Sequence, residues 1–357
     1  MVNAVITGYG AAFPGTETQA ALWSGYFEAH FGGSRLAKRI FESSGVRARH
    51  GAANPLAEDV SSWGTEKRMQ RYVTEALPLG KDAVAAALDD AGLAPADVGL
   101  FAVASCTGYT TPGLDIRLAS DLGMSSAVQR LFVGHMGCYA AIPALGAVAD
   151  FVVARRRPAV LLCLELTSLH VQPPSTDPQQ LVAHALFSDA AAAVVLMPSA
   201  GSLGPGLAGL ELVDVAARTD AATADHMTWD VTDLGFRMGL SPRVPDVLAE
   251  HVGPMVAELL GQHGLDVPDV HGWAVHPGGP RILDVVAAHL RLAPDALDAS
   301  RSVLAEHGNC SSATVLMVAD ELTRARPVPP GGYVVALAFG PGLTLYAALL
   351  RAGSLSR

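Results

Sequence analysis

The sequence predicts an α/β protein with two layered halves of similar plan. Apolar segments that suit strands alternate with segments whose apolar residues recur at helical spacing. The strand segments are apolar without alternation, which is typical of strands covered on both faces. A stretch rich in Gly, Pro and Ser at residues 198–209 separates the halves, so we expect them to span residues 1–200 and 201–357.

The first half predicts five strands and two helices. The strand segments are residues 4–7, 99–105, 126–134, 159–166 and 190–196. The first helix, residues 73–91, is followed by Gly92, a common residue just past a helix end. The second helix, residues 139–155, is long and almost entirely apolar.

The second half repeats this plan loosely. Helices are predicted at residues 245–263, 280–290 and 311–324, and strands at residues 272–275 and 333–339. The last strand runs into a Gly-Pro-Gly turn at residues 340–342. Polar residues follow the strand ends in both halves, and we therefore expect the active site to lie between the halves.

The composition fits a large globular core. Half of the 357 residues are hydrophobic and 16% are charged, below the roughly one quarter that is usual in soluble domains. This shortage of charge indicates that a second chain covers some apolar surface. The net charge is −10, and no basic run is longer than Arg155–Arg157. Because phosphate binding needs the opposite balance, we expect no nucleic-acid partner.

Disulfide, metal and targeting signals are missing from the sequence. The four cysteines, at positions 106, 138, 163 and 310, are far apart and form no CxxC pair, so we expect neither a disulfide framework nor a metal site. The Asp and Glu residues are scattered, and we expect them to be solvated. The N-terminus lacks the basic start of a signal peptide, and Pro, Asp or His interrupts the most apolar stretches, residues 139–154 and 181–197. We expect a cytoplasmic protein without a membrane span.

Cys138 is the first candidate catalytic residue. It lies at the entrance to the apolar helix at residues 139–155, where the helix dipole favours an anion and so lowers the pKa of a thiol. The alternative is that Cys138 is an inert buried cysteine. For Cys163, which lies in the middle of a strand segment, we prefer that inert interpretation.

His276 and Asn309 are the other two candidates. His276 follows a strand end and precedes the rigid turn Pro277–Pro280, and Asn309 stands just ahead of an apolar helix. Alone, each residue could be a helix cap or a surface side chain. Together with Cys138 they supply a nucleophile, a base and a donor for an oxyanion at loop-to-helix junctions. No complete dinucleotide fingerprint, Walker A or HExxH motif is present, so no cofactor is expected.

Several motifs carry a resemblance to a known family. They are Met136-Gly137-Cys138, Ala185-Leu186-Phe187-Ser188-Asp189, Val275-His276-Pro277-Gly278-Gly279-Pro280, Gly308-Asn309-Cys310-Ser311-Ser312-Ala313 and Phe339-Gly340-Pro341-Gly342-Leu343-Thr344. In order and spacing they resemble the type III polyketide synthases, the chalcone synthase-like branch of the thiolase superfamily. The resemblance implies a thiolase fold with αβαβα layers and a homodimer that uses acyl-CoA and malonyl-CoA as substrates.

The same resemblance implies roles for individual residues. Cys138 would hold the acyl chain as a thioester, and His276 would stabilise its thiolate. His276 and Asn309 together would hydrogen-bond the malonyl thioester oxygen during decarboxylation. Phe187 and Phe236 match gating phenylalanines between the CoA tunnel and the acyl cavity. Arg39 matches a CoA-binding arginine, and Arg281 is the substitute for a family lysine whose position is Ser43 here. The remaining matches are the cavity residues Cys106, Thr107, Thr167, His170 and Ser311, and Thr111, which would reach the partner subunit's cavity.

The sequence is compatible with two classes of product. The run at residues 138–141 resembles bacterial members that accept aliphatic acyl-CoA starters and release pyrones or resorcinols. Cys106 and Arg281 resemble members that condense only malonyl units into tetrahydroxynaphthalene. Two further alternatives are a ketoacyl-carrier-protein synthase of the same fold and a catalytically silent dimeric scaffold.

Overall fold

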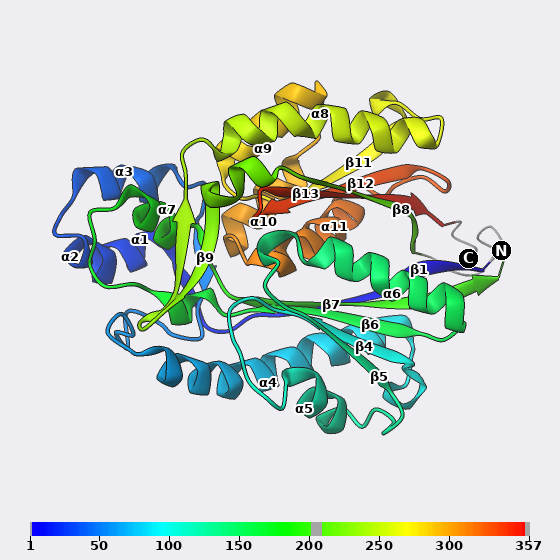
Figure 1. Cartoon of the computed structure of the whole chain (residues 1–357), viewed down its shortest axis with the longest axis horizontal. Helices are drawn as coiled ribbons and strands as arrows, with labels where there is room; N and C mark the ends of the chain where they lie inside the picture. The colour runs from blue at the N-terminus through cyan, green and yellow to red at the C-terminus, as the bar shows by residue number, and fades with distance from the viewer. Residues whose placement is uncertain (1, 201–208, 354–357) are drawn as a thin grey trace.

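The structure, a computed structural model, describes residues 2–200 and 209–353 and arranges them in five layers (Figure 1). Nine strands form one sheet in the order β11-β12-β13-β8-β1-β7-β6-β4-β5. The strands from the first half of the chain are β1 (Val2–Ala12), β4 (Leu100–Ala104), β5 (Gln129–Val133), β6 (Ala159–Glu165) and β7 (Ala190–Ala200). Those from the second half are β8 (Leu210–Thr219), β11 (Val270–Val275), β12 (Tyr333–Gly340) and β13 (Thr344–Ala352).

The two groups of strands meet only through a short pairing of β1 with β8, Val5 with Glu211 and Ile6 with Leu210. Helices α6 (Ala141–Arg155) and α11 (Thr314–Ala325) form the central layer between the two groups. Helices α4 (Thr65–Ala91) and α5 (Leu114–Asp121) cover one outer face, and α8 (Val244–Gln262) and α9 (Pro280–Leu290) cover the other. The αβαβα layering expected of the thiolase fold is therefore confirmed. Most of the Gly/Pro/Ser-rich boundary, residues 201–208, lies outside the described residues.

Alternate side chains of the first-half strands enter two different cores. On β4, Phe101 and Val103 pack in the cluster that includes α4, whereas Ala102 and Ala104 pack in the cluster that includes α6. All five residues of β4 are buried. The strands are continuously apolar because helices cover both of their faces.

The apolar stretch Gly137–Arg155 is long and apolar enough to cross a membrane. In the structure it is α6 together with the turn that precedes it, and α6 packs between the two groups of strands. Its hydrophobicity is explained by this central position in the core.

Further elements that the sequence pattern does not predict surround the site. They are α1 (Gln19–Leu22), α2 (Glu28–His30), α3 (Arg35–Ser43), α7 (Pro178–Leu186), α10 (Asp298–His307), and the pairs β2 (Thr16–Thr18) with β3 (Ala48–His50) and β9 (Met227–Thr232) with β10 (Gly235–Leu240). The predicted helix at residues 311–324 also begins differently, because a 3-10 turn, Ser311–Ala313, precedes α11. Ser311 has a φ of +49°, a left-handed conformation that non-glycine residues rarely adopt outside functional sites.

Strand β1 lies unusually close to α4 because its glycines have no side chains. A Cβ atom on Gly10 would lie 2.3 Å from the carbonyl oxygen of Ala83, and one on Gly8 would lie 2.3 Å from that of Ala87. Backbone atoms on a packed helix cannot move aside, so a methyl group here forces the layers apart.

We expect Gly10→Ala to lower the free energy of unfolding by about 1–3 kcal/mol, the usual effect of overpacking a core. Urea unfolding measures this change. Gly261→Ala is the matched control, because it lies in the last turn of α8 and a Cβ there would meet nothing within 4 Å. Equal unfolding midpoints for the two variants would contradict the close packing of β1 on α4.

Candidate active site

Cys138 lies in the 3-10 turn Gly137–Tyr139, which leads directly into α6. The side chain is 7% exposed. Burial raises the pKa of the thiol to about 12, and the nearby Ser311 hydroxyl opposes this rise in part. Loss of hydration therefore outweighs the lowering of the Cys138 pKa that its position at the helix start was expected to give.

Ser311 and Cys106 stand beside this thiol. The Ser311 hydroxyl lies 3.7 Å from the Cys106 sulfur, and that sulfur lies 3.5 Å from a carboxylate oxygen of Glu165. Burial and the Glu165 carboxylate both raise the pKa of Cys106. Two thiols, a hydroxyl and a carboxylate thus meet at one point between the halves.

Glu165 is the functional-site residue that sequence reasoning missed. It ends β6, is fully buried, and accepts hydrogen bonds from the Cys106 amide (3.0 Å), the Thr107 hydroxyl (2.8 Å) and the Ser312 hydroxyl (2.6 Å). Burial raises its pKa. The expectation that the acidic residues are solvated is wrong here, and the available signal was a single carboxylate inside the apolar segment at residues 159–166.

Asp189 is a second buried carboxylate, at the start of β7. It accepts hydrogen bonds from the amide and hydroxyl of Ser168, from the hydroxyl of Thr167 and from the amide of Ala52. Burial raises the pKa of Asp189, whereas these donors stabilise its charged form. They fix the loop that brings Thr167 to the site.

His276 follows β11 and is held by its backbone. Its amide donates to the carbonyl of Leu337 on β12 (2.8 Å), and its ring packs edge-on against Phe339 with 5.6 Å between centroids. Both ring nitrogens are buried and have no hydrogen-bond partner among the described residues. Burial lowers the pKa of His276 to about 3, so the ring is a neutral imidazole that can accept one proton.

Asn309 lies between α10 and the turn at Ser311. Its amide donates to the carbonyl of Leu186, and its carbonyl accepts from the amide of Ser188. The side-chain oxygen accepts from the Ser311 amide (2.9 Å), which is a local turn rather than a helix cap. Since the oxygen is used in this way, the NH₂ group is the end that can donate to a substrate oxygen.

The end of β12 connects these groups. Phe339 touches the His276 ring, and the next residue, Gly340, is so close to the Cys138 turn that a Cβ there would lie 3.4 Å from the Cys138 nitrogen. Ser311, two residues after Asn309, lines the same cavity as the Cys138 thiol. The motifs that hold the cysteine, the histidine and the asparagine therefore lie near one another between the two halves, but of the three residues only Cys138 lines a cavity.

A small cavity surrounds the Cys138 thiol; we refer to it as the inner cavity. Its lining includes six of the predicted site residues, namely Cys106, Thr107, Cys138, Thr167, Phe187 and Ser311. The other lining residues are Gly137, Met227, Trp229, Met238 and Pro341. None of these five residues is predicted from the sequence to line a cavity.

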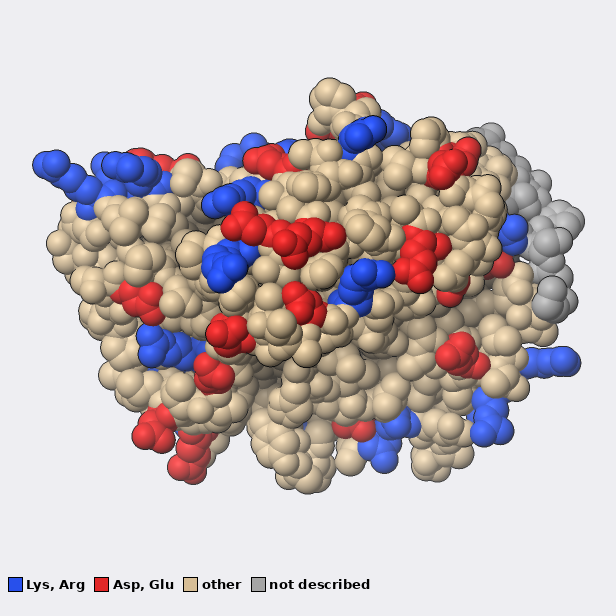
Figure 2. Space-filling model, turned by 45° about the horizontal axis from the view of Figure 1, so that its top comes forward, with Lys and Arg blue, Asp and Glu red and all other residues tan. Residues whose placement is uncertain are grey.

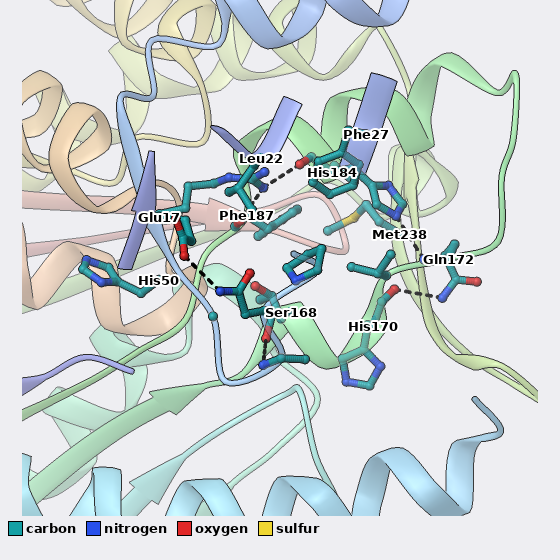
Figure 3. Close-up of a pocket in the computed structure, with 18 of the residues that line it drawn as sticks. Glu17, Leu22, Phe27, His50, Ser168, His170, Gln172, His184, Phe187 and Met238 are labelled. Atoms are coloured by element: carbon teal, nitrogen blue, oxygen red, sulfur yellow. Dashed lines mark hydrogen bonds between the residues drawn. The ribbon is translucent and has the colours of Figure 1, made fainter. Parts of the chain in front are cut away.

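A larger cavity, the outer cavity, shares lining residues with the inner one, and Figure 3 shows the side chains around it. It is mainly apolar, with Leu22 and Phe27 among its walls, and the predicted residues His170 and Phe236 also line it. Four residues line both cavities: Thr167, Phe187, Trp229 and Met238.

Phe187 and Met238 form the boundary between the two cavities. Phe187 sits at the end of α7, its backbone is paired with Asn309, and its carbonyl accepts a hydrogen bond from the buried Arg49. Phe236 lines the outer cavity alone, whereas Met238, two residues further along β10, lines both.

Arg39, Arg281 and Thr111 line neither cavity. Arg281 is exposed and lies 3.9 Å from Asp246, and Thr111 is exposed in the loop that follows β4. Arg39 is exposed on α3 together with Arg35 and Lys38. Figure 2 shows basic side chains gathered at the end of the molecule where α3 lies.

Comparison with known proteins gives the same assignment along the whole chain. Residues 51–200 match the family "Chalcone and stilbene synthases, N-terminal domain", and residues 212–354 match "Chalcone and stilbene synthases, C-terminal domain". The 1,3,6,8-tetrahydroxynaphthalene synthase of Streptomyces peucetius subsp. caesius is 38% identical over 319 residues, 88% of this chain and 83% of the relative. The alpha-pyrone synthesis polyketide synthase-like Pks18 of Mycobacterium tuberculosis is 31% identical over 324 residues, 86% of this chain and 80% of the relative.

Solved structures agree with the sequence matches. The crystal structure of 1,3,6,8-tetrahydroxynaphthalene synthase from Streptomyces coelicolor A3(2), a bacterial type III polyketide synthase, has a TM-score of 0.90 at 30% identity and covers 98% of this chain and 99% of its own. The chain therefore belongs to the chalcone and stilbene synthase family. It is a type III polyketide synthase, an acyltransferase whose family catalyses decarboxylative Claisen condensation.

The Ser311 hydroxyl is expected to assist ionisation of Cys138, so Ser311→Ala should raise the pKa of the thiol further. At any pH below the pKa, a rise of one pKa unit slows alkylation about tenfold. We expect Ser311→Ala to slow alkylation of Cys138 by about this factor. The measurement is the rate of Cys138 modification by iodoacetamide between pH 7 and 10. Ser312→Ala is the control, because its hydroxyl donates to Glu165 instead. Equal slowing in both variants would assign the effect to Glu165 and not to Ser311.

Proposed function

We propose that this enzyme loads an aliphatic acyl group from a CoA thioester, extends it with malonyl-CoA, and cyclises the product to a pyrone or resorcinol. The proposal of an aliphatic starter rests on the outer cavity. This mainly apolar space shares Phe187 and Met238 with the cavity around Cys138. An alkyl chain gains free energy in such a space by leaving water.

Loading begins with the Cys138 thiol and the His276 imidazole both uncharged. The Cys138 thiol gives its proton to the imidazole of His276, and the thiolate attacks the carbonyl carbon of the acyl-CoA. The carbon–sulfur bond to CoA breaks, the acyl group stays on Cys138 as a thioester, and the CoA thiolate takes the proton back from His276. The buried, unpaired ring nitrogens of His276 support this role.

Extension needs a donor at the malonyl thioester oxygen. With CoA gone, His276 and the NH₂ group of Asn309 donate hydrogen bonds to that oxygen, where negative charge develops as the bond to the carboxylate breaks and CO₂ leaves. The enolate carbon attacks the Cys138 thioester, which releases the thiolate and leaves a ketoacyl chain two carbons longer on CoA. The chain returns to Cys138 for another cycle. No metal or redox cofactor takes part in any of these steps.

A second candidate product class is favoured by Cys106. This thiol lines the inner cavity 3.5 Å from Glu165, so a nucleophile and a base stand beside the growing chain. The relatives named tetrahydroxynaphthalene synthases support the corresponding proposal, in which malonyl-CoA supplies both starter and extender. Exposed Arg39 and Arg281 are proposed to meet the CoA phosphates outside the cavities.

The decisive experiment incubates the purified enzyme with malonyl-CoA, alone and with acetyl-CoA or a long-chain acyl-CoA. We expect pyrone or resorcinol products that require the long-chain starter, read by mass spectrometry of the products and of the Cys138 peptide. An aromatic product from malonyl-CoA alone would select the tetrahydroxynaphthalene class instead.

Asn309→Ala serves as the control within this experiment. Because Asn309 is proposed to act at the malonyl carbonyl and not at the thiol, the variant should lose decarboxylation while Cys138 is still acylated. Full decarboxylation in Asn309→Ala would remove its assigned role, and an unmodified Cys138 with every CoA ester would refute the proposed loading step.

The enzyme is further proposed to work as a homodimer joined along β5. This strand is the last in the sheet, has only β4 as a neighbour, and exposes four of its five residues. Phe132 is 42% exposed and Leu131 is 37% exposed. An apolar edge strand left bare invites pairing with another chain, and a second copy would cover it and bring Thr111 near the neighbouring site. Four free thiols and CoA substrates support a cytoplasmic location.

We expect Phe132→Asp to convert the dimer to a monomer, because a charge on the edge strand opposes pairing with a like strand. Light scattering after size-exclusion chromatography measures the mass. Val231→Asp is the control, since Val231 is 70% exposed on β9. The edge-strand interface is refuted if the wild type is a monomer or if Phe132→Asp remains a dimer.

A further inference from the structure

The segment that carries Asn309 is held by a piece of chain from the first half. The Asn309 amide donates to the Leu186 carbonyl (2.8 Å), and the Ser188 amide donates to the Asn309 carbonyl (2.9 Å). These two bonds pair Asn309 with Phe187 as an isolated parallel bridge. The orientation of Asn309 therefore depends on what holds residues 186–188 in place.

Arg49, on strand β3, holds this piece of chain through backbone carbonyl groups. Its Nη1 atom donates to the carbonyl oxygens of His184 (2.5 Å) and Phe187 (3.1 Å), two residues that line the outer cavity (Figure 3). The Leu186 oxygen thus serves Asn309, and the next carbonyl along the chain serves Arg49. A cation at the C-terminal end of α7 is also favoured by the helix dipole.

The Arg49 side chain is a buried cation, with 7% of its surface exposed. Its Nε and Nη2 atoms have no hydrogen-bond partner among the described residues, and the rings of Phe27 and Phe41 lie 5.4 and 5.8 Å from the guanidinium carbon. Burial lowers the pKa of Arg49 to about 10, which Asp189 partly opposes, so the group stays charged at neutral pH. Because a buried charge is costly, the two carbonyl bonds matter to both partners.

Strand β3 also contacts the Asn309 segment directly. A Cβ atom on Gly308 would lie 3.3 Å from the Cγ atom of Arg49, so the aliphatic part of Arg49 lies against Gly308. The next residue, His50, hydrogen-bonds His307 with 2.9 Å between their ring nitrogens. Residues 307–309 are therefore held from the side of β3 as well as from the side of Phe187.

We propose that Arg49 is a positioning residue that orients Asn309 for donation to the malonyl thioester oxygen. It does so by holding the Phe187 carbonyl behind the bridge and by packing on Gly308. This inference rests on the role proposed above for Asn309 in decarboxylation. Arg49 lines only the outer cavity, so it acts on the reaction through Asn309 and not by contact with the reacting atoms.

Two substitutions separate the hydrogen bonds of Arg49 from its volume. Arg49→Met keeps a long unbranched side chain that can pack on Gly308, but it removes the charge and both bonds. Arg49→Lys keeps a cation that can still donate to the Phe187 carbonyl, although an ammonium group lacks the planar fork of a guanidinium.

The matched control is Arg68→Met. Arg68 is also a buried arginine, with 0% exposure, on α4. Its guanidinium group likewise donates to backbone carbonyl groups, which are those of Ser61, Trp63, Leu169 and Val171. Loss of Arg68 therefore reproduces the general effect of removing a buried guanidinium without touching the Asn309 segment.

The first readout compares two steps of the reaction. Arg49→Met should lower kcat for malonyl-CoA decarboxylation about ten- to a hundredfold, because a displaced donor no longer meets the developing charge. KM for malonyl-CoA should change little, since this bond strengthens only in the transition state. Alkylation of Cys138 by iodoacetamide should keep the wild-type rate, and Arg49→Lys should recover part of the decarboxylation.

The second readout is a double-mutant cycle with Asn309→Ala. If Arg49 acts through Asn309, then Arg49→Met lowers decarboxylation in the wild type but not in Asn309→Ala, which has no side-chain amide left to orient. Two independent effects would multiply instead. Release of radiolabelled CO₂ from malonyl-CoA measures the residual rates of the single and double variants.

Hydrogen exchange tests the geometry without any turnover. Loss of the Arg49 bonds frees residues 186–188, so the amides of Ser188 and Asn309 should exchange about fivefold faster in Arg49→Met. Mass spectrometry of the peptides that cover these two amides measures the change. Arg68→Met should leave the exchange of these peptides as it is in the wild type.

The outcomes are distinct. Slower decarboxylation in Arg49→Met, partial recovery in Arg49→Lys and no further loss in the double variant support the proposal. Equal loss of decarboxylation and alkylation, multiplied effects in the double variant, or an equal loss in Arg68→Met overturns it. Thermal unfolding identifies a variant that fails to fold, and Arg49→Lys then carries the same three measurements. If the wild type does not decarboxylate malonyl-CoA, the proposed function fails, whereas hydrogen exchange still decides whether Arg49 holds the Asn309 segment.

Discussion

The buried carboxylate of Glu165 is the point on which the arrangement of the site depends. It accepts hydrogen bonds from Cys106 and Thr107 in the first half of the chain and from Ser312 in the second half. A fully buried carboxylate without hydrogen-bond donors would strongly destabilise the folded state. The three donors and Glu165 therefore hold one another in place. Ser312 is followed by the helix α11, and its neighbour Ser311 lines the inner cavity with Cys138. Glu165 thus links the two halves beside the inner cavity.

The walls of the cavities are held by a different kind of interaction. Around the inner cavity, Trp229 and Met238 come from a hairpin whose own two strands bury little, and hydrogen bonds to neighbouring backbone groups hold that hairpin in place. Such bonds contribute only about 1 kcal/mol each, but they are directional and fix an orientation. The three candidate catalytic residues thus lie next to the packed core, whereas this cavity wall is held by a few polar contacts.

The fold class could be predicted from sequence, and the three candidate catalytic residues could be singled out there, because both leave local patterns. Continuous apolar segments mark strands covered on both faces, and Cys138, His276 and Asn309 each stand next to glycine- or proline-rich turns. Met238 left no such pattern, and Glu165 left only a single carboxylate inside an apolar segment. A methionine in a strand usually signals packing, and the side of β10 that faces the cavity depends on how the hairpin is attached. The pKa of Cys138 was misjudged for a related reason: helix position is visible in a sequence, whereas burial by Pro341 and Ser311 from distant segments is not.

The neutral state of the free site has a physical consequence for the proposed loading step. Burial disfavours the thiolate of Cys138 and the imidazolium of His276 when each is considered alone, which is why their pKa values move to about 12 and about 3. The same low polarity strengthens the attraction between the two charges once both exist. In the proposed loading step, charge separation is therefore favoured only when Cys138 and His276 ionise together.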